Sequence, residues 1–300
     1  MERRERRRRW RKRLVALADM LAGLILVAGI GVWAIMGRVC SPAKPPPGQK
    51  QPVPAFFRGM PRVLNIAHRG ASENAPEHTL EAYDLALRHG ADVLELDVRM
   101  TADGVLLAAH DATLKRTLGL DFAIAKLSYE ELSRRAGERR PLRLEDVIAH
   151  FPGVRFNLEL KDESLEGARA LARLVERTRA ESRVLVASAH DDVMEEFRRN
   201  AGPQVATSAS MGEALRFHFC HLVGRSCSMP FVALQLPPLR WLGLTRRKFL
   251  LEAHEAGLVV HYWTIDGERA QRRLIEAGAD GIMTNRPAQL SQVLATRDKR

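Results

Sequence analysis

The sequence predicts an α/β fold, a (β/α)8 TIM barrel preceded by one N-terminal transmembrane helix. Three observations predict it. An apolar run follows a basic N-terminus, short β-branched runs alternate with amphipathic ones, and polar residues recur where the short runs end. The chain has 300 residues, 46% of them hydrophobic, which is enough for one large core. This composition is that of a folded protein and argues against wholesale disorder.

The net charge of +11 is concentrated at the N-terminus. Residues 2–13 carry nine basic side chains and two acidic ones, so the remainder of the chain is only mildly basic. A nucleic-acid-binding protein would need a basic face on its folded domain, with aromatic or base-reading residues, and no segment offers one. We therefore expect no nucleic-acid partner and interpret residues 1–13 as a basic cytoplasmic tail.

Residues 14–36 are almost uninterruptedly apolar and are broken only by Asp19. As a helix they would span about 34 Å, which matches the hydrocarbon core of a bilayer. Because Lys and Arg stay on the cytoplasmic side, we expect a single-pass membrane anchor with a cytoplasmic N-terminus and an extracytoplasmic folded domain. A cleaved signal peptide is the alternative. We favour it less because the apolar run is long and no small-residue cleavage site follows it.

Residues 37–60 contain six prolines and predict an extended linker, and the barrel is expected over residues 61–297. Apolar residues spaced three or four apart predict its helices, for example around residues 80–87 and 165–175. About eight strand–helix units in this length are typical of a (β/α)8 barrel, and a doubly wound open sheet is the competing architecture. Nine strands are predicted, one of them surplus, with 204–207 the least certain: 63–67, 92–98, 105–110, 155–160, 183–188, 204–207, 231–236, 259–263 and 280–283.

Polar residues that can act in catalysis appear towards the C-terminal ends of the predicted strands. In a (β/α)8 barrel, active sites assemble at this end, which favours the barrel over the open sheet. Glu95 and Asp97 lie two positions apart in one apolar strand, so both carboxylates face inward. Adjacent buried carboxylates repel each other unless a cation compensates. The residues concerned are His68, Arg69, Glu95, Asp97, His110, Glu159 and Lys161.

Three carboxylates converging on one barrel mouth predict a site for a hard divalent cation, Mg²⁺ or Ca²⁺. Glu159 supplies the third carboxylate from another strand, two positions before Lys161. The alternative is a layer of salt bridges, in which Arg69 or Lys161 neutralises the acids. His68 and His110 could each be structural, but beside a metal they are candidates for acid–base catalysis.

Seven short motifs, taken in order, resemble the signature of the glycerophosphodiester phosphodiesterase family. The resemblance covers about residues 63–287 and depends on the ordered set rather than on any single motif. The motifs are His68-Arg69-Gly70, residues 75–80 (APEHTL), 95–98 (ELDV), Asp103-Gly104 followed by His110-Asp111, 157–161 (NLELK), 263–266 (WTID) and 281–287 (GIMTNRP).

The resemblance implies a TIM-barrel enzyme that hydrolyses glycerophosphodiesters to glycerol 3-phosphate and an alcohol. It leaves open which histidine is the acid, and whether water or the 2-hydroxyl of glycerol attacks. It implies that Glu95, Asp97 and Glu159 hold one divalent ion, that His68 and His110 are the general acid and base, that Arg69 and Lys161 bind the phosphate, and that Glu77 and Trp263 support the site.

The chain departs from the family pattern at a few positions. His78 and Asp266 stand where the family usually has Asn, and Asn285 stands where it usually has Asp. Residues 188–190 (SAH) replace the usual Ser-Phe. No proposed ligand or catalytic histidine is lost. His78 could alter how Glu77 is supported, and Asp266 adds a negative charge near Trp263. These departures leave the reaction class standing and put the substrate in doubt.

An apolar stretch over residues 229–244 precedes three basic residues, 246–248. It is interpreted either as a packed strand and loop or as a lip that binds an acyl chain or grazes the bilayer. The second interpretation favours a lysophospholipase D that acts on membrane lysophospholipids. A candidate from another class is an inactive, membrane-tethered binding barrel, which the intact site residues disfavour. No protein partner is indicated.

The three cysteines are too few for a disulfide framework. Cys220 and Cys227 could pair in an oxidising compartment, but their spacing does not decide it. The neighbouring His218 and His221 superficially suggest a zinc site, although the spacing matches no common structural zinc pattern. We expect these side chains to pack in the core.

Overall fold

The computed structural model describes residues 54–223 and 229–297. The predicted basic tail, the predicted transmembrane segment and most of the predicted linker lie outside these residues, as do Cys40 and Cys227. Within the described part, none of the helices has the length and apolar character needed to cross a membrane. Cys220 is buried in a helix and takes part in a disulfide bond.

Eight parallel strands form a closed barrel, which confirms the predicted architecture over the open sheet. Seven neighbouring pairs join them in the order β8-β7-β6-β2-β1-β11-β10-β9. A parallel bridge between Ser208 and Ala233 connects the two ends of this order and closes the barrel. The strands are β1 (Leu64–His68), β2 (Val93–Met100), β6 (Arg155–Leu160), β7 (Val184–Ser188), β8 (Ala206–Thr207), β9 (Ala233–Leu236), β10 (Val259–Tyr262) and β11 (Gly281–Thr284).

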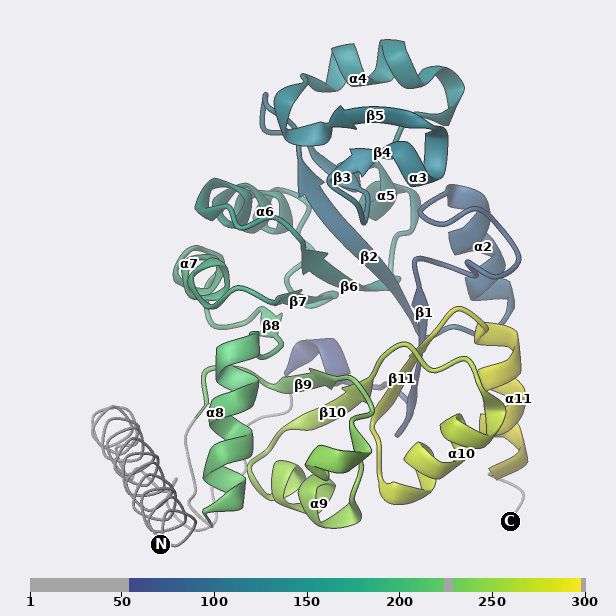
Figure 1. The fold of residues 1–300 in the computed structure, drawn as a ribbon, viewed down its shortest axis with the longest axis vertical. Coiled ribbons are helices and arrows are strands. Elements are labelled where there is room, and N and C mark those ends of the chain that lie inside the picture. The colour runs from purple at the N-terminus through teal and green to yellow at the C-terminus, as the bar shows by residue number, and fades with distance from the viewer. Residues whose placement is uncertain (1–53, 224–228, 298–300) are drawn as a thin grey trace, which may run out of the picture. The chain divides into compact units, whose positions relative to one another are not determined.

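Helices surround the strands (Figure 1). Several begin at a hydroxyl residue whose side chain accepts a hydrogen bond from a backbone N–H of the first turn, as at Thr79, Ser164 and Ser210. Helix α10 ends at Gly278, where φ is 115° and glycine avoids the steric cost of a side chain. The helices are α2 (Leu80–Arg88), α5 (Leu144–His150), α6 (Leu165–Arg177), α7 (Asp191–Ala201), α8 (Met211–Leu222), α9 (Arg247–Glu255), α10 (Glu268–Ala277) and α11 (Pro287–Arg297).

The surplus predicted strand is 105–110, not the one considered least certain. Residues Leu106–Ala108 form β3, which pairs antiparallel with β2 and stays outside the barrel, whereas 204–207 contains barrel strand β8. Only residues 101–105 separate β2 from β3, and a parallel crossover needs a dozen or more. The prediction failed because β3 is as apolar and buried as a barrel strand.

An excursion, defined here as residues 109–143, follows β3 and projects from one side of the barrel (Figure 1). Its small core contains Leu114, Ile124 and Leu132, all buried. After the excursion the chain continues into α5 and then β6. Excursion residues such as Arg116 line a cavity together with His110 at the barrel rim. Its elements are β4 (Thr113–Leu114), α3 (Lys115–Leu118), β5 (Leu120–Ala123), α4 (Tyr129–Ala136) and the 3₁₀ turns Ile124–Lys126 and Gly137–Arg139.

The barrel interior changes from apolar to polar along the strands. At the N-terminal ends, Phe56 packs against Leu64, Val93 and Ala233 and is only 1% exposed. Phe56 belongs to a 3₁₀ turn (Ala55–Phe57), so the folded domain begins before residue 61. Higher up, Asn157, Gln235 and His261 form a polar layer, in which Gln235 Nε2 donates to Asn157 Oδ1 at 2.6 Å. Charged side chains follow at the C-terminal ends.

Candidate functional site

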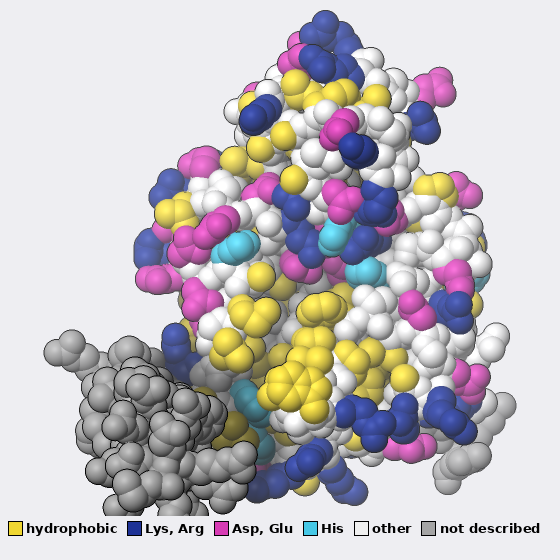
Figure 2. Space-filling model, viewed as in Figure 1, with side chains coloured by type: hydrophobic (Ala, Val, Ile, Leu, Met, Phe, Trp, Pro, Cys, Tyr) yellow, Lys and Arg dark blue, Asp and Glu magenta, His cyan; other side chains and the backbone are white. Residues whose placement is uncertain are grey.

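The predicted site residues gather at the C-terminal ends of the barrel strands. A cavity of about 350 Å³ opens there, and Glu95 and Asp97 are each buried to 1% exposure on β2. A second cavity of about 630 Å³ lies next to it, shares His110 and is lined by Glu77. Figure 2 shows histidine, acidic and basic side chains together on this face, beside a hydrophobic area. The first cavity is lined by six predicted residues: His68, Arg69, His110, Glu159, Lys161 and Trp263.

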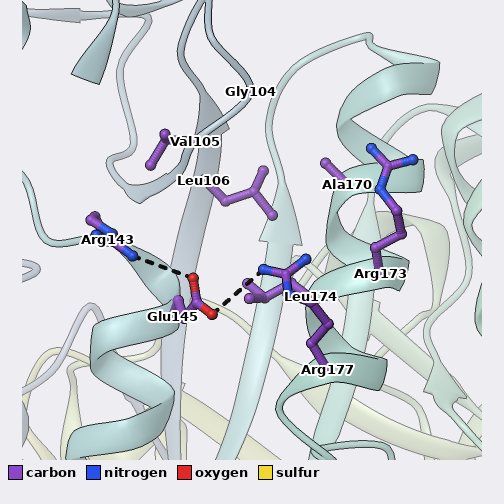
Figure 3. Close-up of a pocket in the computed structure, with 9 residues that line it drawn as sticks. All are labelled: Gly104, Val105, Leu106, Arg143, Glu145, Ala170, Arg173, Leu174 and Arg177. Atoms are coloured by element: carbon purple, nitrogen blue, oxygen red, sulfur yellow. Dashed lines mark hydrogen bonds and ion pairs between the residues drawn. The ribbon is translucent and has the colours of Figure 1, made fainter. Parts of the chain in front are cut away.

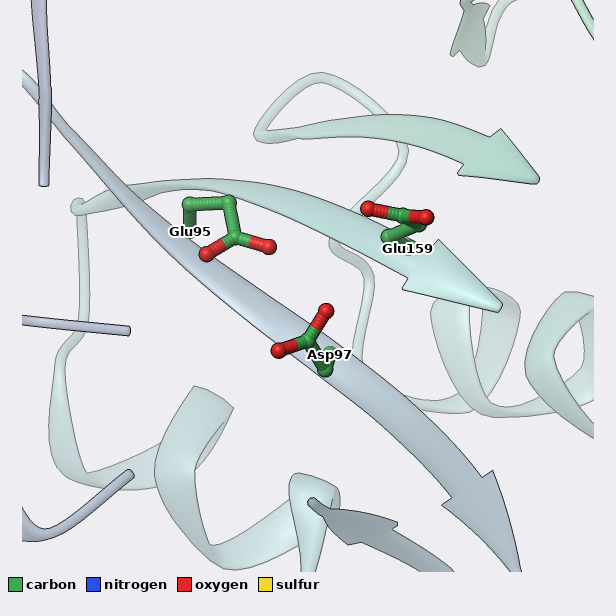
Figure 4. A group of neighbouring side chains, drawn as sticks. All are labelled: Glu95, Asp97 and Glu159. Atoms are coloured by element: carbon green, nitrogen blue, oxygen red, sulfur yellow. The ribbon is translucent and has the colours of Figure 1, made fainter. Parts of the chain in front are cut away.

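The three carboxylates form one cluster (Figure 4). Glu95 and Asp97 lie on the same face of β2, and Asp97 is the register partner of Glu159 on the neighbouring strand β6. One oxygen from each carboxylate lies within 4.8 Å of the other two. It is the only group of three such ligands in the described residues. The structure therefore brings together the side chains that the strand spacing pointed to.

Two basic side chains contact this cluster, as the salt-bridge alternative predicted. Arg69 Nε lies 2.9 Å from Asp97 Oδ2. Lys161 Nζ lies 3.0 Å from Asp97 Oδ1 and 2.8 Å from Glu159 Oε1. Burial alone would raise the pKa of Asp97, but His78, Lys161 and Arg69 hold it well below its usual range. The negative charges of Asp97 and Glu159 are thus balanced by basic side chains of the protein.

Glu95 is not compensated in the same way. Its Oε2 accepts a hydrogen bond from the backbone N–H of Arg69 at 2.9 Å, while its buried Oε1 has no hydrogen-bond partner. Burial, followed by the charges of Asp97 and Glu159, raises the pKa of Glu95 well above its usual range. A divalent cation would supply the missing compensation, and carboxylate oxygens are the ligands that Mg²⁺ and Ca²⁺ prefer. The residues present therefore fit such an ion.

His78 is a site residue whose role the sequence did not reveal. Its Nε2 donates to Asp97 Oδ2 at 3.1 Å, and its Nδ1 lies 2.9 Å from the hydroxyl oxygen of Tyr83. His78 has a φ of 58°, a region in which His and Asn are enriched. The sequence pointed to an influence of His78 on the support of Glu77; in the structure the hydrogen bonds of the His78 ring go to Asp97 and Tyr83.

His68 is held through its Nδ1 atom, 2.7 Å from Asn285 Oδ1. Asn285 in turn donates from Nδ2 to Asp266 Oδ2 at 2.7 Å and from its backbone N to Asp266 Oδ1 at 2.8 Å. An amide oxygen only accepts, so His68 carries its proton on Nδ1 and leaves Nε2 as an acceptor. Burial lowers the pKa of His68 to about 4, against the opposing effect of the hydrogen bond to Asn285.

His110 has a charged partner. Its Nδ1 lies 2.7 Å from Asp111 Oδ1, and Arg116 Nε donates to Asp111 Oδ2 at 2.6 Å. The two Nη atoms of Arg116 also donate to the carboxylate of Glu77 at 2.7 and 2.8 Å. Arg116, on α3 of the excursion, therefore links Glu77 to Asp111, the partner of His110. Sequence reasoning missed Arg116 because no motif marked it.

The apolar part of the first cavity comes from the second half of the barrel. Leu215 and Met211 on α8 line it and are 58% and 59% exposed. His218 also lines it, while the neighbouring His221 contacts the carboxylate of Glu252. The remaining apolar lining includes Leu236, Pro237, Leu239, Leu242, Leu244 and Phe249.

A third cavity of about 300 Å³ lies away from this site, beside α5 and α6 (Figure 3). Its Glu145 pairs with Arg143 at 3.3 Å and with Arg177 at 3.5 Å. Arg173 pairs with Glu166 at 2.6 Å. These arginines are already matched by carboxylates, so the cavity offers no comparable chemistry.

The sequence matches one protein family over most of the folded domain. Residues 68–289 match the model of the glycerophosphoryl diester phosphodiesterase family. The chain belongs to this family. "Probable glycerophosphodiester phosphodiesterase 2" of Mycobacterium tuberculosis is 30% identical to it over 256 residues, which cover 82% of this chain and 96% of that protein. "Lysophospholipase D GDPD3" of Homo sapiens is 27% identical over 273 residues, which cover 78% and 85% of the two chains.

Solved structures of this phosphodiesterase family have the same fold. A glycerophosphodiester phosphodiesterase from Agrobacterium tumefaciens is 26% identical, with a TM-score of 0.63 and coverage of 76% of this chain and 98% of that one. An Oleispira antarctica phosphodiesterase, solved with the product sn-glycerol-3-phosphate, is 25% identical, with a TM-score of 0.63 and coverage of 78% and 97%. The protein is thus an enzyme, a phosphodiesterase that hydrolyses glycerophosphodiesters.

Proposed function

We propose that this phosphodiesterase depends on one divalent cation, Mg²⁺ or Ca²⁺, held by Glu95, Asp97 and Glu159. The observation that carries the proposal is the buried Glu95 Oε1, which has no partner although two other carboxylates converge on it. When bound, the ion would polarise a phosphoryl oxygen and orient the substrate. Products would be glycerol 3-phosphate and an alcohol.

The charges of the site support binding of a phosphodiester. Three carboxylates, the two basic side chains of Arg69 and Lys161, a divalent ion and a singly charged phosphodiester together carry no net charge. Arg69 and Lys161 both line the cavity, where they would contact the phosphate and the additional negative charge of its transition state. Without the ion, the same set would leave a negative charge that repels the substrate.

The two histidines have partners that suit opposite roles. His68 donates its Nδ1 proton to the neutral amide of Asn285, so its Nε2 is free to take a proton from the attacking water or 2-hydroxyl. His110 instead contacts a carboxylate through Nδ1, that of Asp111, which orients the ring for proton transfer at Nε2. As the new P–O bond forms and the ester P–O bond breaks, His110 would give its proton to the leaving alkoxide. We therefore assign His68 as base and His110 as acid.

Metal removal tests the central part of this proposal. Hydrolysis of glycerophosphocholine should stop in excess EDTA and return with Mg²⁺ or Ca²⁺. Glu95→Gln should weaken metal binding in calorimetric titration of the metal-free protein, whereas the exposed Glu81→Gln should leave it unchanged. Full activity in excess EDTA would refute the metal assignment.

A second candidate substrate class is the lysophospholipids, favoured by the apolar lining of the cavity that contains His68 and His110. An acyl chain would occupy the side near α8 and η4 (Arg240–Leu242) while the phosphate stays between the basic residues. The human relative is named a lysophospholipase D. We keep soluble glycerophosphodiesters as the first candidate, because an apolar rim also serves simply to enclose the reaction.

We also propose that residues 14–36 anchor the enzyme in a membrane, with residues 1–13 in the cytoplasm and the barrel on the extracytoplasmic side. The basic residues before the apolar run support this orientation. Such an anchor would keep the enzyme close to lipid-derived substrates.

A further inference from the structure

The hydrogen bonds behind His68 form a chain that ends at a carboxylate. His68 Nδ1 contacts Asn285 Oδ1, and Asn285 Nδ2 contacts Asp266 Oδ2, each at 2.7 Å. We propose that Asn285 and Asp266 are positioning residues, which hold His68 in the tautomer that carries a proton on Nδ1 and none on Nε2. This inference builds on the proposed role of His68 as a base, since only the unprotonated Nε2 can accept a proton.

The orientation of the Asn285 amide follows from its neighbours. The carboxylate of Asp266 accepts hydrogen bonds from the Asn285 backbone N at 2.8 Å and from Thr284 Oγ1 at 2.9 Å. Reversing the amide would place its oxygen against a carboxylate oxygen 2.7 Å away, which is repulsive. The Ser72 hydroxyl lies 2.8 Å from Asn285 Oδ1 and 2.9 Å from the backbone carbonyl oxygen of His68, and its one hydrogen can be donated to either oxygen.

Asp266 is therefore the fixed end of the chain. It only accepts hydrogen bonds, which forces Nδ2 of Asn285 toward it and Oδ1 toward His68. Asp266 does not line the cavity, so its effect on the reaction is exerted through Asn285. If the amide turned, Nδ2 would face His68, the ring would move its proton to Nε2, and the nitrogen available for catalysis would no longer accept one.

Replacing Asp266 tests this chain directly. In Asp266→Asn, whichever way the new amide turns, its N–H groups meet either the backbone N–H or the side-chain N–H of Asn285. We expect kcat to fall roughly 10²- to 10⁴-fold, the cost expected when a catalytic histidine is held in the wrong tautomer, with KM changed less than about threefold. Imidazole ¹⁵N NMR should show the proton of His68 moving from Nδ1 to Nε2.

The exchanged pair provides the rescue. In Asp266→Asn with Asn285→Asp, the new carboxylate accepts from His68 Nδ1 and from the new amide, so every hydrogen bond of the chain has a partner again. This double variant should regain kcat to within about tenfold of the native enzyme and return the Nδ1 proton. Gln289→Ala is the matched control, because Gln289 Nε2 contacts only the backbone carbonyl of Asp266, at 2.8 Å, and Gln271.

The readouts separate this inference from the proposed function. An Nδ1-protonated His68 in Asp266→Asn, with native kcat, would overturn the inference. If Asp266→Asn does not fold, Asn285→Ala removes the acceptor directly, and an unchanged tautomer there would overturn it equally. Native turnover in His68→Ala would instead refute the role of His68 as base, whatever the tautomer spectra show.

Discussion

At the scale of single residues, the two histidines are both held through Nδ1 but by chemically different partners, a neutral amide and a carboxylate. This difference supports the unequal roles that we propose for His68 and His110, although both line one cavity. It also means that the two rings depend on separate supports, Asp266 behind one and Arg116 behind the other. Damage to one support should leave the other histidine in place.

Removing either ring should slow the reaction. We expect His68→Ala and His110→Ala each to lower kcat about 10²- to 10⁴-fold, the usual contribution of a positioned acid or base. His254→Ala is the control, because His254 contacts Asp280 at 2.7 Å near the N-terminal end of β11, away from the cavity. Steady-state kinetics with glycerophosphocholine measures the effect. Near-native turnover in one of the first two variants would disprove the role of that histidine.

The residues that lie on strands could be predicted, and those that act through distant contacts could not. Glu95 and Asp97 were placed together because alternate residues of a strand face the same side. Arg116, in contrast, contacts Glu77, which lies 39 positions away in the sequence, and no local pattern around either residue predicts this ion pair. His78 was noticed only because the family usually has Asn at this position. Its contact with Asp97 depends on the local turn, in which His78 has a positive φ, and the sequence alone does not show that geometry.

At the scale of elements, the alternation of strands and helices predicted the barrel, but not which apolar segment stays outside it. Strand β3 and strand β8 are both short and buried, and only their pairing distinguishes them. The five residues between β2 and β3 would have revealed the hairpin, since no crossover helix fits there. The folded domain also begins earlier than predicted. Phe56 was assigned to the linker because prolines surround it in the sequence, yet its side chain packs in the barrel.

Helix α8 offers a test of the acyl-chain proposal. Leu215 is 58% exposed and lines the cavity, so Leu215→Asp should leave the fold intact while placing a charge where an acyl chain would lie. We expect at least a tenfold loss of kcat/KM for lysophosphatidylcholine and little change for glycerophosphocholine. Leu222→Asp, on the same helix, 66% exposed and outside the cavity, is the matched control. Equal effects of Leu215→Asp on both substrates would count against an acyl site.

At the scale of the whole molecule, the proposed orientation predicts where a protease can reach the barrel. Protease added outside cells whose outer barrier has been opened should degrade the barrel, because a positively charged tail would keep the N-terminus of such an anchor inside. A reporter protein fused before residue 1 should stay protected in the same experiment. Protection of the barrel together with loss of the reporter would reverse the proposed topology.

Phe56 has a consequence for how such an anchored enzyme could face its substrate. Phe56 packs at the N-terminal ends of the strands, so the chain enters the barrel at the pole opposite the catalytic mouth. For an anchor at residues 14–36, the 17 residues 37–53 are the tether, which can extend to about 60 Å at most. That reach is about twice the thickness of a bilayer's hydrocarbon core. A tether of this reach would limit the distance between the enzyme and the membrane and would leave the catalytic mouth free to turn toward lipid or toward solutes.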